Sequence, residues 1–153
     1  MYTVRRMLMA DLFWLERAAV QAAWETLSDQ ERLTPPWVVG QLAVSHLRSL
    51  LMQPSTLVLV AQLGAWPVGF LVGAVVPDGS TGELNGLLIN LWVAPAHRRR
   101  GVARLLRETA EALFRQMGVR KAKLWTGLHN QAAVKLAQQA GYKPEGLIGM
   151  KSL

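Results

Sequence analysis

The sequence predicts a mixed α/β fold in a single domain, residues 1–153, with six to seven strands and about four helices. Two apolar, β-branched runs, at residues 56–63 and 66–76, flank the short turn Gly64-Ala65 and are typical of a β-hairpin. Other segments have apolar residues at helical spacing, and segments of the two kinds alternate along the chain. No repeat, low-complexity run or linker indicates a second domain.

One strand and two helices are expected before the hairpin. Residues 3–8 are a candidate strand, and Asp11 is placed to cap a helix that ends near Ser28. A second helix begins after Pro35-Pro36, because proline suits a first helical turn, and Pro54 prevents its continuation.

After the hairpin, residues 83–93 are expected to form a strand that stops at Ala94-Pro95. Gly86 inside this strand indicates a bulge or a close backbone approach. Residues 102–117 have one apolar helical face, and Gly118 follows as a C-terminal cap would.

The last quarter of the chain predicts a strand at residues 121–127 and a short helix that Asn130 caps and Gly141 ends. The tail, residues 142–153, is interpreted as one or two closing strands.

The composition is typical of a globular domain with excess positive charge. Hydrophobic residues make up 51% and charged residues 18%, and the formal net charge of +7 indicates an anionic partner such as nucleic acid, a membrane surface or a phosphorylated molecule. The chain has no cysteine, which excludes disulfides, zinc-thiolate sites and a cysteine nucleophile and favours a reducing, cytoplasmic compartment. Three scattered histidines predict no metal centre. We expect neither a signal peptide nor a membrane span.

The decapeptide HRRRGVARLL, residues 97–106, lies where the predicted strand 83–93 passes into the helix 102–117. A first helical turn has free N–H groups and the positive end of the helix dipole, so a glycine in the entry loop makes a phosphate pocket. Gly101 lets an anion approach the main chain, Ala103 is small, and the arginines add positive charge. A diphosphate is the predicted ligand. The phosphate motifs GxxxxGK[ST] and GxGxxG after a first strand are both absent, which disfavours nucleoside triphosphate and dinucleotide sites.

Residues 91–103, LWVAPAHRRRGVA, resemble the signature of the GNAT superfamily of acyl-CoA-dependent N-acyltransferases, [Q/R]-x-x-G-x-[G/A]. Arg98, Gly101 and Ala103 match its defined positions, and the preceding strand and following helix match its context. Residues 130–142 are similar to the next motif of the family, in which an asparagine starts a helix that ends at glycine and an aromatic residue.

The resemblance implies a central mixed, mostly antiparallel twisted sheet and acetyl-CoA as co-substrate. Backbone groups of residues 91–93 would hydrogen-bond the pantetheine arm, the amides of residues 99–103 would hold the pyrophosphate, and Asn130 would lie near the thioester. The amine would attack the thioester directly, without a covalent enzyme intermediate. The residues that this resemblance assigns to the cofactor are Leu91, Trp92, Val93, Arg98, Arg99, Arg100, Gly101, Val102, Ala103 and Asn130.

The chain departs from the family at the residues that transfer protons. The position of the usual carboxylate base in the family corresponds to Asn85 or Leu87 here, and the position of the usual tyrosine acid corresponds to Ala137. Glu83 and Tyr142 are the remaining catalytic candidates, and a proton relay through ordered water is the alternative.

Two classes of function are consistent with these residues. One is an N-acetyltransferase that acts on a primary amine of a small molecule or peptide, and the other is a non-catalytic acyl-CoA-sensing or basic nucleic-acid-binding module. Nucleic acid is disfavoured because the basic residues are spread along the chain. A homodimer is left open, and no membrane partner is expected.

The acceptor pocket is predicted only in outline. An acidic cluster of Glu25, Asp29, Glu31 and Glu83 would attract a cationic amine. By the resemblance, the first two helices and the late strands wall this pocket, so three tryptophans are candidates to line it: Trp24, Trp37 and Trp125.

Overall fold

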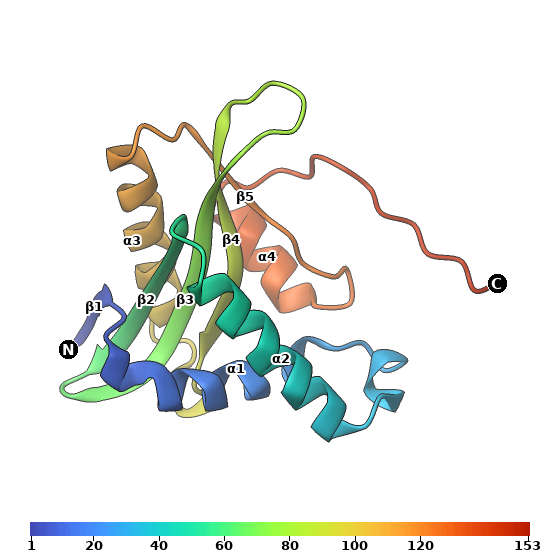
Figure 1. The fold of residues 1–153 in the computed structure, drawn as a ribbon, viewed down its shortest axis with the longest axis horizontal. Coiled ribbons are helices and arrows are strands. Elements are labelled where there is room, and N and C mark those ends of the chain that lie inside the picture. Colours follow the sequence, from blue (N-terminus) through green and yellow to red (C-terminus); the bar gives the residue numbers. More distant parts are fainter.

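The computed structural model describes residues 1–153 as one five-stranded sheet with four α-helices (Figure 1). The strands are β1 (Tyr2–Arg6), β2 (Thr56–Leu63), β3 (Trp66–Pro77), β4 (Leu84–Val93) and β5 (Lys121–Leu124). The α-helices are α1 (Leu12–Thr26), α2 (Pro36–Leu51), α3 (Val102–Gln116) and α4 (Gln131–Gln139). Three short 3-10 helices are η1 (Met9–Asp11), η2 (Glu31–Leu33) and η3 (Pro95–His97). The mixed α/β class and the four helices are confirmed.

The strands follow one another across the sheet in chain order, β1-β2-β3-β4-β5. The first four strands pair antiparallel, and the hairpin predicted for β2 and β3 is confirmed. The connection from β4 through α3 to β5 makes the last pair parallel. The sheet is therefore mixed and mostly antiparallel, as the resemblance implied.

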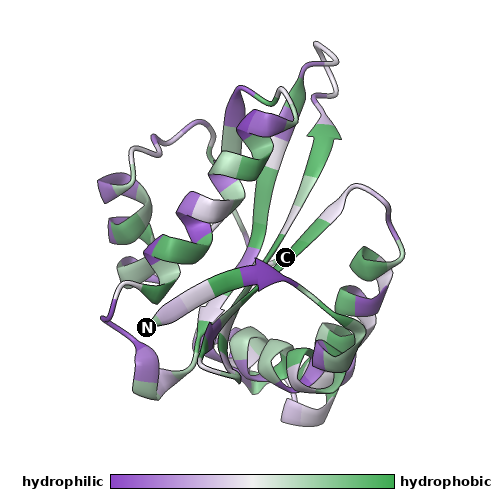
Figure 2. Ribbon diagram, turned by 90° about the vertical axis from the view of Figure 1, so that its left-hand side faces the viewer, coloured by the Kyte–Doolittle hydropathy of each residue, from purple (hydrophilic) through white to green (hydrophobic).

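Helices cover both faces of this sheet. On one face, α1 packs Leu15 against Phe70 and Trp92 of the strands. On the other face, α3 packs Leu106 and Phe114 against a second apolar cluster. Figure 2 shows the central strands mostly in the green of hydrophobic residues, whereas the helices carry both colours, as amphipathic helices do.

The expected closing strands are not formed, which corrects the strand number from six or seven to five. The tail after Tyr142 has no regular secondary structure and extends away from the sheet (Figure 1). Pro144 has no N–H to donate to a ladder, and Gly146 and Gly149 weaken any strand here. The apolar tail residues are accordingly exposed: Leu147, Ile148, Met150 and Leu153.

The predicted strand 83–93 contains both a bulge and a close backbone approach, at different residues. The pairing of β3 with β4 passes from Val72↔Asn90 to Gly73↔Leu88, so Ile89 is the extra residue. Gly86 lies instead against the ring of Phe114.

The Asp11 side chain does not cap α1 as predicted, because its carboxylate is occupied by Arg5 and the Leu8 amide. The other local signals at helix ends are confirmed. The Asn130 side chain accepts a hydrogen bond from the Ala133 amide at 3.3 Å, and Gly118 and Gly141 have φ values of 80° and 93°. Segment lengths differ slightly: β1 ends at residue 6, α1 ends at residue 26, and β5 covers only residues 121–124. β5 is shorter because the chain leaves the sheet after Leu124 to cross toward α1.

Candidate functional site

The first component of the site is an unpaired segment of β4. Residues 85–88 pair with β5 over residues 121–124, but β4 continues to Val93 after β5 has ended. The bulge residue Ile89 marks the point of separation. Backbone N–H and C=O groups of residues 89–93 that point away from β3 therefore have no strand partner. The residues expected to bind pantetheine lie in this segment: Leu91, Trp92 and Val93.

The second component is the loop that enters α3. Arg99 is the only non-glycine residue of the chain with a positive φ, 59°, and Gly101 follows at 82°. Gly101 is the residue before Val102, the first of a 15-residue helix, and no side chain caps this helix. The amides of the first turn of α3 are thus free to bind an anion, and a Cβ at Gly101 would meet no atom within 4 Å.

A cavity of about 310 Å³ lies beside this helix start. Its lining includes Arg100, Gly101 and Arg104, with Tyr2 of β1 on the other side. Neither Arg99 nor Arg100 belongs to an ion pair in the structure, whereas Arg104 pairs with Glu108 one turn further along α3. The loop therefore presents exposed positive charge next to unbonded amides.

Arg98 has a different role from the two arginines that follow it. Its Nε donates to the Val93 carbonyl at 2.8 Å, and its terminal nitrogen forms an ion pair with the Glu25 carboxylate. The same Glu25 oxygen accepts a hydrogen bond from Trp92 Nε1 at 3.2 Å. The structure thus joins α1, β4 and the loop through one carboxylate. Glu25 is separated from Trp92 and Arg98 by 67 and 73 residues, and no local sequence pattern indicates this contact.

Helix α4 is anchored at both ends by hydrogen bonds of its flanking residues to α1 and α3. Before it, His129 Nε2 donates to the carbonyl of Thr26 at the end of α1, at 2.8 Å. After it, the Tyr142 hydroxyl donates to Glu111 of α3 at 2.9 Å. The Asn130 side-chain oxygen is occupied by the cap of α4, which leaves its NH₂ group for any ligand contact.

The two catalytic candidates lie apart from each other. Glu83 is exposed and pairs with Lys121 at 3.2 Å. It lies six residues before Ile89, which corresponds to about 20 Å along a strand. Burial, together with the hydrogen bond to Glu111, raises the pKa of Tyr142 well above its ordinary value, so its hydroxyl stays protonated. Neither placement joins these side chains to the unpaired segment of β4, and their catalytic roles stay predictions.

Asn85 is buried in the paired part of β4, with 4% of its surface exposed. Its side-chain oxygen has no hydrogen-bond partner, which is unusual for a buried polar atom. Leu87 lies two residues closer to the bulge on the same face of the sheet. The positions of the family's usual base therefore hold one neutral amide and one hydrocarbon.

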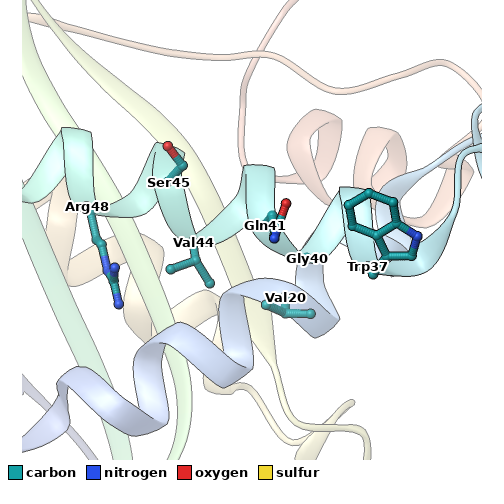
Figure 3. Close-up of a pocket in the computed structure, with 7 residues that line it drawn as sticks. All are labelled: Val20, Trp37, Gly40, Gln41, Val44, Ser45 and Arg48. Carbon is teal, nitrogen blue, oxygen red and sulfur yellow. The ribbon is translucent and has the colours of Figure 1, made fainter.

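The three tryptophans proposed for an acceptor pocket have different surroundings. Trp37 lines a groove of about 510 Å³ between α1 and α2, with Val20, Gly40 and Arg48 (Figure 3). Trp24 lies beneath the guanidinium of Arg32, and Trp125 is exposed after β5.

A strand that separates from its neighbour is thus followed along the chain by a glycine-led helix start, the two features that the family resemblance implied. The family model described as "Acetyltransferase (GNAT) family" matches residues 10–142, and the chain belongs to this family. The family resemblance stated from the sequence is therefore confirmed. No helix is both long and apolar enough to cross a membrane.

Curated relatives and solved structures agree with this assignment. The proteins named N-acetyltransferase 8 from Mus musculus and Rattus norvegicus are each 33% identical to this chain over 87 residues, which is 57% of the chain. The matched stretch spans only 38% and 39% of those relatives.

Solved structures show the same fold over the whole chain. A putative acetyl transferase from Pyrococcus furiosus superposes with a TM-score of 0.86 at 19% identity, with 100% of both chains covered. A GCN5-related N-acetyltransferase from Ralstonia eutropha has a TM-score of 0.80 at 22% identity, with 99% of both chains covered. The protein AAC(6')-Iy, solved with a bisubstrate analog of CoA and acetylneamine, has a TM-score of 0.76 at 19% identity, with 100% and 99% covered.

Proposed function

We propose that this protein transfers the acetyl group of acetyl-CoA to a primary amine of a small molecule or peptide, by direct attack within a ternary complex. The observation that carries the proposal is the uncapped start of α3, led by Gly101, directly after the unpaired segment of β4. An extended thiol ester with a diphosphate needs both features, namely a strand-like partner for its amides and an anion site beyond it.

The residues present fit this co-substrate. The first-turn amides of α3, with the positive charge of Arg99 and Arg100, would hold the pyrophosphate. The unpaired backbone groups of residues 91–93 would pair with the amides of the pantetheine arm. Bound acetyl-CoA would supply a thioester carbonyl, and an N–H of the same strand segment would stabilise the negative charge that develops on its oxygen.

Proton removal from the acceptor is the step for which the chain offers no obvious group. Asn85 and Leu87 do not titrate, Ala137 replaces the usual acid, and Glu83 is paired with Lys121. We therefore infer that the amine loses its proton to water and that only the unprotonated amine attacks. The chain's own contribution is then orientation and charge stabilisation, which alone account for large rate factors.

The acceptor is proposed as an amine because of the family and because of the acidic end of α1. Structural neighbours include an aminoglycoside N-acetyltransferase solved with CoA and with a bisubstrate analog of CoA and acetylneamine. In this chain Glu25 contacts Trp92 of the unpaired segment but is paired with Arg98, whereas Asp29 and Glu31, beyond the end of α1, belong to no ion pair. These two carboxylates would attract a cationic amine despite the net charge of +7.

Two measurements test the proposal. Acetyl-CoA or CoA should raise the melting temperature, since a ligand of the native state stabilises it by mass action. A panel of amines incubated with acetyl-CoA should then release CoA thiol with at least one acceptor. No melting shift at millimolar CoA would remove the cofactor assignment.

A non-catalytic acyl-CoA sensor is the second candidate, favoured by the neutral residues at the usual proton-transfer positions. Tight CoA binding without thiol release for any amine would support it. The basic charge also allows a nucleic-acid-binding module, which a gel shift that weakens steeply with salt would detect.

A further inference from the structure

The carboxylate of Glu25 is the one side chain that contacts both components of the candidate cofactor site. It lies next to the last residue of α1, and its Oε2 atom accepts from Trp92 of β4 and from Arg98 of the loop. Trp92 is buried, whereas Glu25 and Arg98 are both partly exposed. The carboxylate therefore lies at the edge of the core, where the unpaired strand segment meets the loop.

Two of the three guanidinium nitrogens of Arg98 are bonded to protein groups. Its Nε donates to the carbonyl of Val93, the last residue of β4, and a terminal nitrogen donates to the Glu25 carboxylate. Arg98 thereby ties the loop back to the strand that precedes it. This use of the fork-shaped donor depends on its planar geometry, which lysine does not have.

The loop needs such anchors because its backbone is unusual. Arg99 has a positive φ of 59°, a conformation that a non-glycine residue keeps only where surrounding contacts hold it. The loop is held on one side by His97, which hydrogen-bonds the Tyr2 hydroxyl at 3.0 Å. On the other side it is held by Arg98, and Arg98 by Glu25. The anion-binding amides follow directly after these two anchors.

We propose that Glu25 is a positioning residue for the cofactor: acting through Arg98 and Trp92, it holds the α3 entry loop and the unpaired β4 segment in the arrangement that binds acetyl-CoA. The inference rests on the proposed function. In this inference Arg98 holds the loop in shape and does not bind the phosphates of the cofactor directly. Arg99 and Arg100 supply the positive charge that attracts the phosphates.

The test compares CoA affinity, measured by isothermal titration calorimetry, between the wild-type chain and Glu25→Ala, Arg98→Ala and the double variant. We expect each single variant to weaken CoA binding about tenfold, since an anchored charged hydrogen bond is lost. The CoA affinity of the double variant should lie within about twofold of that of Arg98→Ala, because both changes break the same Glu25–Arg98 contact. Glu25→Gln keeps a side-chain oxygen that can accept from both Trp92 and Arg98, so it should recover part of the CoA affinity.

A matched control is available on the same helix. Glu16 of α1 also pairs with an arginine, Arg48 of α2 at 2.7 Å, but it lies nine residues before Glu25, about 13 Å along the helix. Glu16→Ala should leave CoA affinity unchanged within about twofold. Kinetics give a second readout: in Glu25→Ala the KM for acetyl-CoA should rise while kcat stays within about threefold.

The outcomes separate the inference from the proposed function. If the wild type binds no CoA, the proposed function fails first. If the wild type binds CoA and Glu25→Ala binds it as well as Glu16→Ala does, the positioning role is wrong. A fall of kcat beyond a hundredfold in both Glu25→Ala and Glu25→Gln, with CoA affinity unchanged, would also overturn it and make Glu25 a general base.

Discussion

The ring of Phe114 in α3 lies directly over Gly86 of β4, so close that a Cβ on this glycine would be 2.7 Å from two ring atoms. This contact lets α3 approach β4 closely, three residues before the point at which β4 separates from β5. It therefore influences the distance between α3 and the unpaired segment.

The first prediction follows from this contact. Gly86→Ala should lower the free energy of unfolding by about 2 kcal/mol, because neither the strand backbone nor a buried ring moves easily. Urea denaturation measures it. Gly79→Ala is the control, since a Cβ there would meet nothing within 4 Å. Adding Phe114→Leu should make the loss from Gly86→Ala smaller; equal losses in both backgrounds would contradict the contact.

The second prediction concerns the two glycines at the ends of α3. Gly101 and Gly118 have φ values of 82° and 80°, and both face open space. Replacing either with valine should therefore cost a similar strain, about 1–2 kcal/mol. Only Gly101→Val should also abolish the rise in melting temperature with CoA, because its side chain would cover the free amides. Differential scanning fluorimetry compares the two variants, and normal CoA binding by Gly101→Val would show that the loop is not the anion site.

The third prediction is a pH dependence of stability at Asp11. Two hydrogen bonds from Arg5, at 2.7 and 2.9 Å, and one from the Leu8 amide hold the pKa of Asp11 below its ordinary value. A carboxylate with a lowered folded pKa stabilises above its unfolded pKa of about 3.9, and loses this effect as the pH falls through the folded pKa. Asp11→Asn should thus cost about 1–2 kcal/mol at pH 7.

Urea titrations at pH 7, 5 and 3 measure this gap between wild type and Asp11→Asn. It should be constant from pH 7 to 5 and shrink at pH 3. A gap that stays the same at pH 3 would show that the charge of Asp11 contributes nothing.

The fourth prediction addresses the weak catalytic candidates. Glu83→Gln and Tyr142→Phe should each keep turnover within about tenfold, well short of the ~10²–10⁴ that a general base or acid supplies. Glu83 is exposed and paired with Lys121, and the Tyr142 hydroxyl is bonded to Glu111. Steady-state kinetics with a confirmed acceptor measure both. A loss beyond a hundredfold in Glu83→Gln, with unchanged CoA affinity, would establish this residue as the base.

The fifth prediction is the pH profile of the reaction. Without a protein base, the rate should climb with pH toward the pKa of the acceptor amine. A more acidic amine should shift the whole profile to lower pH by the difference between the two pKa values. A profile that stays at one pH for both amines would reveal a titrating group of the protein instead.

Features that depend on neighbouring residues could be predicted from the amino-acid sequence. Apolar periodicity defined the four helices and the β2–β3 hairpin, and the glycine between the arginines and α3 predicted the uncapped helix start that we propose as the anion site. Asn130 and Gly118 were found as helix ends because a cap needs only residues within a few positions of each other. These signals are local, so they can be read without a model of the fold.

Features that depend on pairs of residues far apart in the chain became visible in the folded structure alone. The bulge lies at Ile89 rather than Gly86, because its position is set by the register against β3 and by the ring of Phe114. The tail forms no strand, although one or two were predicted. Strand formation needs a partner edge, and the sequence of the tail does not show whether one is present. Glu25 meets Arg98 across 73 residues. Packing alone brings such groups together, and the energy of a contact between distant residues leaves no pattern in either segment.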